Sequence, residues 1–176
     1  MKFKIFRFKK VESTNNSAIR IIKNSDIDYG MVIANEQKNG RGQYGKKWIS
    51  HNGNLFVSFF YKLDHLIVSL NEITTINCLL VKKLLSIYYK KKITVKKPND
   101  LLIDKKKICG ILQEKISKLN KKYLIVGIGI NLIKNPNLKK YPTTNLSDLL
   151  NKRVSKNKIE KQIKKIFEIK LTKLYK

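Results

Sequence analysis

The sequence predicts an α+β fold in which a mixed, largely antiparallel sheet is backed by helices. Four short runs rich in apolar and β-branched residues follow one another between residues 93 and 130, with no helical pattern between them. Consecutive strands without intervening helices favour antiparallel or mixed pairing. Two longer segments, 69–87 and 155–174, repeat apolar residues at helical spacing, so each offers one apolar stripe to the sheet.

The first third of the chain reads as a strand, a helix and two further strands. Polar and apolar side chains alternate over residues 2–8, which indicates a half-buried strand. Ser13 or Thr14 can cap the next helix, whose apolar face consists of Ala18, Ile19 and Ile22. Residues 31–35 and 54–61 are short β-rich runs. The glycine-rich segment between these two runs is therefore expected to be held by a strand on each side.

The rest of the chain adds a helix, four strands and a final helix. Ser69 and Glu72 have the spacing of a capping box, and the helix that they begin carries Ile73, Ile76, Leu80, Leu84 and Ile87. The four strands are expected at residues 93–95, 101–103, 108–112 and 123–130, with a turn at 104–106. The final amphipathic helix, residues 155–174, carries Ile159, Ile163, Ile166, Phe167, Leu171 and Leu174 on one face.

Size and cysteine content favour one intracellular domain. A chain of 176 residues can bury a core without disulfides or metal staples, so we expect a single domain over residues 1–176. Cys78 and Cys109 lie in apolar surroundings without the spacing of zinc ligands, which favours buried, reduced thiols in the cytoplasm. No apolar run reaches the roughly eighteen residues of a membrane span, and the first ten residues lack the apolar core of a signal peptide.

The strong positive charge is compatible with nucleic-acid binding but has a simpler explanation. The net charge is +27, yet only four of the 39 basic residues are arginines. A phosphate-binding surface favours arginine, whose planar fork of donors fits phosphate. The lysines are also spread along the whole chain. A bias toward residues with adenine- and thymine-rich codons is therefore the favoured interpretation, and no specific DNA partner is expected.

Residues 37–48 form a glycine-punctuated loop with Arg41 at its centre and the only tryptophan, Trp48, at its end. Its three glycines can take positive φ and let the backbone approach a ligand closely. Arg41 offers donors that suit a carboxylate or a phosphate. We therefore expect an anion to bind here, although a loop of this kind taken alone is at least as often a simple hairpin connection.

Several motifs follow one another in the order found in one enzyme family. They are Glu12-Ser13-Thr14-Asn15, the loop of residues 37–48, Gly53-Asn54-Leu55, Lys96-Lys97-Pro98-Asn99-Asp100, the segment from Lys107 to Glu114 and the segment from Gly127 to Leu132. Together these motifs, between about Val11 and Leu150, resemble the catalytic domain of the biotin protein ligases. The resemblance implies the fold of the biotin and lipoate ligases, in a short form without a DNA-binding domain.

The resemblance also implies an activity. Biotin protein ligases use ATP and Mg²⁺ to activate biotin as biotinyl-AMP and then transfer biotin to a lysine of a carrier protein. The expected partner is a biotin carboxyl carrier protein, a subunit of acetyl-CoA carboxylase. The expected state is a monomer or homodimer in the cytoplasm with no membrane partner. Two alternatives stay open: a lipoate or octanoate ligase or transferase of the same fold, and a protein that has lost catalysis and only binds biotin or nucleic acid.

The resemblance assigns roles residue by residue. Arg41 and Lys107 are the expected catalytic residues, placed to offset the charge of the biotin carboxylate and the α-phosphate. Asp100 is the expected magnesium ligand. The expected biotin-binding residues are Ser13, Thr14, Asn15, Gln37, Arg41, Gly42, Gln43, Lys107 and Gly110. The expected nucleotide-binding residues are Gly40, Trp48, Lys96, Asn99 and Asn131.

Some of these residues also fit a purely structural role. Ser13 and Thr14 can simply cap a helix, and Trp48 can be a half-buried core side chain. Lys107 closes a three-lysine turn of the kind that is usually solvated. Only the Cys-Gly-Ile-Leu segment that follows selects Lys107 over the two lysines before it.

The chain departs from the family pattern at three places. Gln43 stands where these ligases usually carry a second loop arginine that helps to hold the adenylate, and Lys97 stands where they usually have tryptophan. Related ligases usually continue into a small C-terminal β domain, which we expect to be absent here, with the helix at residues 155–174 in its place. Without the second arginine, biotinyl-AMP is expected to leave more readily.

Overall fold

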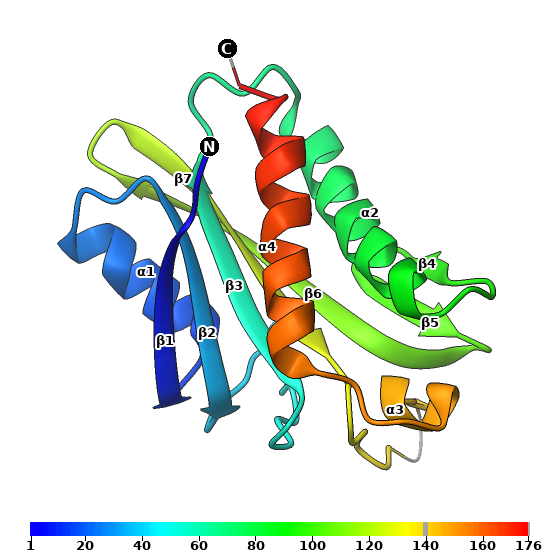
Figure 1. Ribbon diagram of the computed structural model, residues 1–176. Helices are drawn as coiled ribbons and strands as arrows, with labels where there is room; N and C mark the ends of the chain where they lie inside the picture. The colour runs from blue at the N-terminus through cyan, green and yellow to red at the C-terminus, as the bar shows by residue number, and fades with distance from the viewer. Residues whose placement is uncertain (139–140, 176) are drawn as a thin grey trace.

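The computed structural model describes residues 1–138 and 141–175, which form one seven-stranded sheet (Figure 1). The strands are β1 (Lys4–Val11), β2 (Tyr29–Gln37), β3 (Leu55–Lys62), β4 (Thr94–Lys96), β5 (Asp100–Ile103), β6 (Lys106–Lys118) and β7 (Lys121–Ile130). Their order across the sheet is β1-β2-β3-β7-β6-β5-β4. β1 pairs with β2 in parallel, and all other neighbouring strands are antiparallel. The predicted mixed, largely antiparallel sheet is confirmed.

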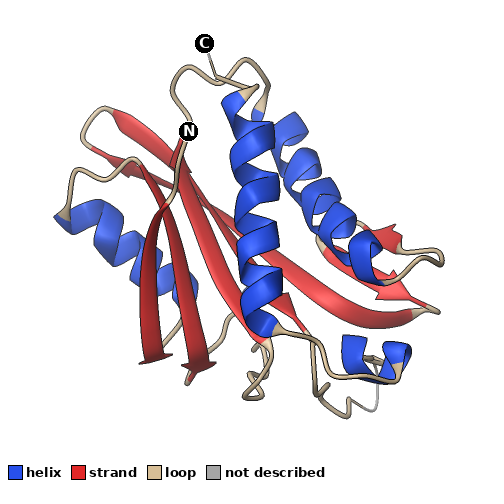
Figure 2. Cartoon of the chain, viewed as in Figure 1, coloured by secondary structure: helices blue, strands red, loops and turns tan. Residues whose placement is uncertain are grey.

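Helices cover both faces of the sheet (Figure 2). They are α1 (Thr14–Asn24), α2 (Leu70–Tyr88), α3 (Leu146–Leu150) and α4 (Lys156–Thr172). Side chains alternate along each strand, so Met31 and Ile33 of β2 pack in the core beneath α2 and α4, whereas Val32 packs against α1. The sheet therefore separates a large core under α2 and α4 from a smaller one under α1.

An aromatic stack joins α4 to the sheet. Phe59 of β3 and Phe167 of α4 are fully buried, and their ring centroids lie 4.1 Å apart with planes 4° from parallel. Phe3 meets the Phe59 ring edge-on at a centroid distance of 5.0 Å. Each such pair adds about 0.5–1.5 kcal/mol beyond the burial of its surface. The stack therefore contributes to the attachment of the last helix to the sheet.

Polar contacts fasten α4 to the segment around β1 as well. The Phe3 backbone N–H donates to Glu168 Oε1 at 2.8 Å. Arg7 of β1 pairs with Glu160 of α4 at 2.6 Å, and the Glu160 side chain is only 3% exposed. A carboxylate this deeply buried requires its partner, because an unpaired buried charge is strongly destabilising. The first strand and the last helix thus depend on each other.

Two strands differ in extent from the prediction. β1 begins and ends later than the predicted residues 2–8, and because it is an edge strand, its apolar side chains Ile5 and Phe8 are 42% and 37% exposed. β6 continues to Lys118, well past the predicted end at residue 112, because its polar second half pairs with β7 in a long hairpin. Hydrophobic patterning marks only the buried half of such a strand.

Predictions from short sequence patterns in and near the helices agree better with the structure. The capping box at α2 is confirmed: the Ser69 N–H donates to Glu72 Oε2 at 2.8 Å, and the Glu72 N–H donates to Ser69 Oγ at 3.3 Å. Cys78 and Cys109 are buried free thiols, as predicted. The five-residue helix α3 was not predicted, since it is too short to show a helical period. Within the described residues, no helix has the length and apolarity needed to cross a membrane.

Candidate active site

A cavity of about 590 Å³ opens over β6 and β7, next to the glycine loop of residues 37–48. The start of α1, the turn at residues 96–100 and the segment around Tyr141 complete its walls. Among the described lining residues, Asp100 is the single carboxylate. Six cationic side chains line the same cavity, namely Arg41, Lys46, Lys47, Lys96, Lys97 and Lys107. The site is therefore suited to a strongly anionic ligand.

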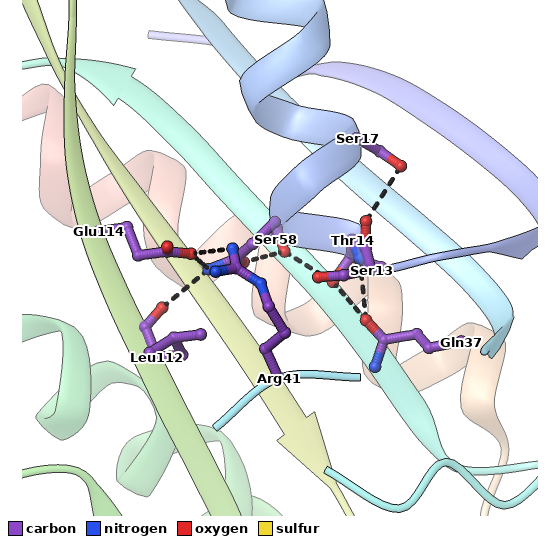
Figure 3. Close-up of polar contacts among 9 residues, drawn as sticks. Ser13, Thr14, Ser17, Gln37, Arg41, Ser58, Leu112 and Glu114 are labelled. Atoms are coloured by element: carbon purple, nitrogen blue, oxygen red, sulfur yellow. Dashed lines mark hydrogen bonds and ion pairs between the residues drawn. The ribbon is translucent and has the colours of Figure 1, made fainter. Parts of the chain in front are cut away.

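The wall formed by α1 carries a network of neutral hydrogen-bonding groups (Figure 3). The Ser58 hydroxyl donates to Asn15 Oδ1 at 2.5 Å and lies 2.7 Å from Thr14 Oγ1. Gln37 Oε1 accepts from the backbone N–H and the hydroxyl of Thr14, at 2.8 and 3.1 Å. Amides and hydroxyls supply both donors and acceptors, so this wall can bind a polar group that carries no charge.

Ser13 stands at the N-cap position of α1, yet its side chain makes no capping hydrogen bond. Its carbonyl oxygen instead accepts from the backbone N–H and the hydroxyl of Ser17, at 3.0 and 3.1 Å. The alternative in which Ser13 or Thr14 caps the helix with its side chain is therefore wrong, since the Thr14 hydroxyl also pairs elsewhere, with Gln37 and Ser58. Ser13 is buried and lines the cavity, which leaves its hydroxyl available for a ligand.

The glycine loop is folded back on itself. The Gly42 N–H donates to the Lys46 carbonyl at 2.6 Å, and the Trp48 N–H donates to the Gly40 carbonyl at 2.8 Å. All three loop glycines can take positive φ, but only Gly45 does so, at 72°. Gly40 is required for a different reason, since an added Cβ would lie 2.5 Å from the Trp48 carbonyl oxygen.

The Trp48 ring packs closely against the backbone of two glycines, Gly110 and Gly129. An added Cβ at Gly129 would lie 2.4 Å from Trp48 Cε2, and one at Gly110 would lie 2.7 Å from Trp48 Cζ3. Trp48 is half-buried, as its structural interpretation expects, and it also lines the cavity. Its indole Nε1 is buried without a hydrogen-bond partner among the described residues. The ring is therefore both a packing element and an exposed wall of the site.

Lys107 is set apart from the lysines around it. Its Nζ pairs with Asp100 Oδ1 at 2.7 Å and lies 5.4 Å from the Trp48 ring centroid and 5.5 Å from that of Tyr141. Lys106, one residue earlier, is exposed. The Tyr141 hydroxyl donates to Asp100 Oδ2 at 2.7 Å, and burial together with the Asp100 charge raises the pKa of Tyr141, so the phenol stays protonated. The Lys107 ammonium thus lies in the site paired with the Asp100 carboxylate and close to two aromatic rings.

Three residues expected to hold the nucleotide lie on the same side of the cavity. Lys96 Nζ lies 4.6 Å from the centroid of the Tyr141 ring. The Asn99 side chain donates to the Ile111 carbonyl at 2.9 Å, which fixes the turn before β5 against β6. Asn131 Nδ2 donates to the Thr144 carbonyl at 3.1 Å, and its Oδ1 is buried without a partner in the described part of the chain.

The structure brings the residues of the expected site together. Each of them lines the cavity except Gly40, which packs within the loop against the Trp48 carbonyl. Gly42, Gln43 and Lys97 lie at the wall next to the loop and the turn. Three further residues were not foreseen: Ser58, Tyr141 and Glu114, the last of which pairs with Arg41 at 2.6 Å. Ser58 and Glu114 lie in β3 and β6, where their residue types do not mark them as part of a site, and Tyr141 lies outside the helices and strands.

The surroundings of Asp100 meet some, but not all, of the requirements of a metal-binding site. No group of three or more His, Cys, Asp or Glu side chains that could hold a metal occurs in residues 1–138 and 141–175. Both Asp100 oxygens are already engaged, one by Lys107 and one by Tyr141. Mg²⁺ is usually bound through one or two carboxylates together with substrate phosphates, and a single carboxylate matches that arrangement once phosphates are present.

Comparisons with known proteins agree on one family. A family model described as the biotin/lipoate A/B protein ligase family matches residues 7–131. The bifunctional ligase/repressor BirA of Escherichia coli K12 is 32% identical over 127 residues, which are 69% of this chain and 38% of that protein. BirA of Bacillus subtilis is 30% identical over 129 residues, or 72% and 40% of the two chains. The chain thus spans about two fifths of the length of these curated relatives.

Solved structures extend the comparison to nearly the whole chain. A biotin protein ligase from Aquifex aeolicus in complex with biotin and ATP superposes with a TM-score of 0.81 at 30% identity, covering 98% of this chain and 72% of that one. A lipoate-protein ligase A bound with ATP gives a TM-score of 0.68 at 13% identity, covering 98% and 86% of the two chains. The second likeness concerns the fold alone.

Proposed function

Because the chain belongs to the biotin/lipoate A/B protein ligase family, we propose that it activates biotin with ATP and transfers the biotinyl group to a protein lysine. In the first step a biotin carboxylate oxygen attacks the α-phosphate of ATP, forming biotinyl-AMP and releasing pyrophosphate. In the second step a lysine amine attacks the activated carbonyl, forming an amide and releasing AMP. Both steps develop negative charge that fixed cations can stabilise.

The observation that carries this proposal is the pairing of two chemically different walls in one cavity. Ser13, Thr14 and Asn15 line the α1 side of the cavity with neutral donors and acceptors. Arg41 and Lys107 offer cations on the loop and β6. Biotin has a neutral ureido ring at one end and a carboxylate at the other, so it matches both walls. The phosphates of ATP match the remaining lysines.

We assign Arg41 and Lys107 to the reacting groups. The carboxylate and the α-phosphate repel each other as they approach, and two cations at the meeting point offset that repulsion. Lys107 is held by Asp100, so its ammonium needs little reorganisation during the reaction. Mg²⁺, when bound with the nucleotide at Asp100, would neutralise further phosphate charge.

The same polar wall favours biotin over lipoate, the substrate of the open alternative within this fold. A lipoyl group would bring an apolar dithiolane to this wall and would offer no hydrogen-bond partner to the buried Ser13 hydroxyl, which lines the cavity. A site built for hydrogen bonds rejects analogues that lack them by roughly 10⁴-fold in favourable cases. Biotin selectivity is therefore an expected property of this cavity.

The acceptor in this proposal is a carrier-protein lysine, as in biotin carboxyl carrier proteins. The net charge of +27 would attract a carrier domain with an acidic surface and speed the encounter at low salt. We place the reaction in the cytoplasm, whose reducing conditions suit the two free buried thiols.

The proposal is tested by transfer of labelled biotin to a purified carrier domain with ATP and Mg²⁺. Label should appear on the carrier only when ATP is present, and a roughly hundredfold excess of lipoate should not compete, given the polar selectivity argued above. Arg41→Ala should reduce transfer by about a hundredfold, since one donor to the developing charge is removed. Biotin binding without transfer would instead indicate a protein that has lost catalysis, and competition by lipoate would favour the lipoate alternative.

Replacing Gln43 with arginine should slow the escape of biotinyl-AMP. Gln43 lines the cavity at the turn Gln43–Gly45, so an arginine there would add a cation to the wall of the cavity proposed to hold the adenylate. A charge-assisted hydrogen bond of this kind corresponds to about a tenfold slower release, measured by chasing labelled adenylate from the protein. Leu79→Arg on α2 is the matched control, because it adds the same charge at a distant exposed position. Equal release rates for Gln43→Arg and the unaltered protein would contradict the prediction.

A further inference from the structure

Glu114 of β6 contacts two residues of the proposed biotin site at once (Figure 3). Its Oε2 accepts from Arg41 Nη2 at 2.6 Å and from Asn15 Nδ2 at 2.7 Å. Its side chain is 25% exposed and that of Arg41 is 38% exposed, so water does not fully screen the pair. One carboxylate oxygen therefore links the glycine loop to α1 across the sheet.

Arg41 lies between two hollows of the surface. It lines both the main cavity and a second hollow of about 330 Å³, whereas Glu114 lines only the second hollow. Glu114 thus approaches the guanidinium from the side away from the main cavity. Arginine has five N–H donors in a planar fork, so the contact with Glu114 leaves donors for a carboxylate in the main cavity.

Asn15 is fixed equally closely by the same contact. Its amide is 2% exposed, its Oδ1 accepts from Ser58, and its Nδ2 donates to Glu114 and, at 3.3 Å, to the Leu112 carbonyl. Gly127 lies directly beneath, since an added Cβ would be 2.2 Å from Asn15 Oδ1. The orientation of the amide is therefore set by Glu114 at one end and Ser58 at the other.

We infer that Glu114 is a positioning residue for biotin recognition, holding Arg41 for the carboxylate while holding Asn15 for the ureido ring. This inference rests on the proposed function. An arginine on a glycine-rich loop loses considerable rotamer freedom when it binds a ligand, and a partner that orders it beforehand reduces that cost. Glu114 therefore strengthens carboxylate binding through Arg41, although it is itself an anion.

An alternative role for Glu114, as a competitor of the substrate for Arg41, predicts the opposite effect on biotin binding. If Glu114 merely occupied the guanidinium until a substrate displaced it, removal of its charge would free Arg41 and strengthen binding of the biotin carboxylate. Glu114→Gln separates the two roles of the residue. The glutamine oxygen can still accept from Asn15, but the charge that holds Arg41 is gone.

The test is calorimetric titration of the unaltered protein and Glu114→Gln with biotin and with biotin methyl ester, which has no carboxylate. We expect Glu114→Gln to weaken biotin binding about tenfold, the value of one charge-assisted hydrogen bond, and to leave ester binding unchanged. In an Arg41→Ala background the same substitution should have no further effect on biotin binding. Glu114→Ala, which also frees Asn15, should weaken both ligands.

Glu36→Gln is the matched control, since it removes the charge of an exposed carboxylate whose partner, Lys10, lies outside the site. It should bind both ligands as the unaltered protein does. Biotin binding by Glu114→Gln that equals or exceeds that of the unaltered protein would overturn the positioning role while leaving the proposed function intact. Failure of the unaltered protein to bind biotin would overturn both.

Discussion

Replacing Lys107 with methionine should slow the formation of biotinyl-AMP by about a hundred- to a thousandfold, the usual effect of losing one donor to developing charge. Methionine keeps the apolar contact with the rings of Trp48 and Tyr141 but cannot offset the repulsion between the biotin carboxylate and the α-phosphate. The rate is measured as biotin-dependent exchange of labelled pyrophosphate into ATP. Biotin affinity should change much less than the rate, because the substitution leaves unchanged the wall of Thr14 and Asn15 that we propose for the ureido ring.

Lys106→Met is the control for this substitution. Lys106 carries the same charge one residue earlier, but it is exposed, so its loss should leave the exchange rate within about twofold, as for most surface substitutions. Lys107→Met also leaves the Asp100 carboxylate without its cation, so thermal unfolding of each variant separates a lost catalytic group from a lost fold. A folded Lys107→Met protein with a normal exchange rate would remove Lys107 from the chemistry.

Replacing Phe167 with alanine should lower the free energy of unfolding by about 3–5 kcal/mol, the typical cost of removing a buried aromatic side chain. The ring is fully buried and stacks on Phe59 at 4.1 Å, so its loss leaves a cavity between α4 and β3. Domains of this size usually have only about 5–15 kcal/mol of stability, so the variant would retain a small margin. Urea unfolding followed by circular dichroism measures the change.

Ile169→Ala on the same helix is the matched control. Ile169 is 52% exposed, and alanine is a better helix former than isoleucine, so the free energy of unfolding should change by less than about 0.5 kcal/mol. A similar loss in both variants would mean that the effect of Phe167→Ala is not specific to the buried stack with Phe59.

The parts of the fold that the sequence predicted are those encoded over short distances. The capping box of Ser69 and Glu72 and the alternation along β2 are visible within a few residues. The order of strands is not, because β3 pairs with β7 across more than sixty residues of chain, and only the packed structure selects that neighbour. The polar second half of β6 also escaped prediction, since it is held mainly by its pairing with β7.

The candidate site likewise contains residues that the sequence predicted and residues that it did not. Arg41, Asp100 and Lys107 lie in motifs with a recognisable local pattern. Glu114 and Ser58 do not, because their roles arise from partners 73 and 44 residues away, Arg41 and Thr14 respectively. Before the fold is known, a glutamate in a lysine-rich strand is indistinguishable from a solvated one.

Because β1 and β3 pack against α4, the chain cannot complete its native packing until the end of its synthesis. During synthesis, Phe59 and the apolar face around it emerge from the ribosome long before Phe167, which covers them. Until α4 (Lys156–Thr172) has been released, the nascent sheet has no cover over that part of its face, and exposed apolar surface of this kind promotes aggregation. Native packing is therefore completed only after translation has passed the last helix, and slow translation of the second half of the chain would lengthen the period of exposure.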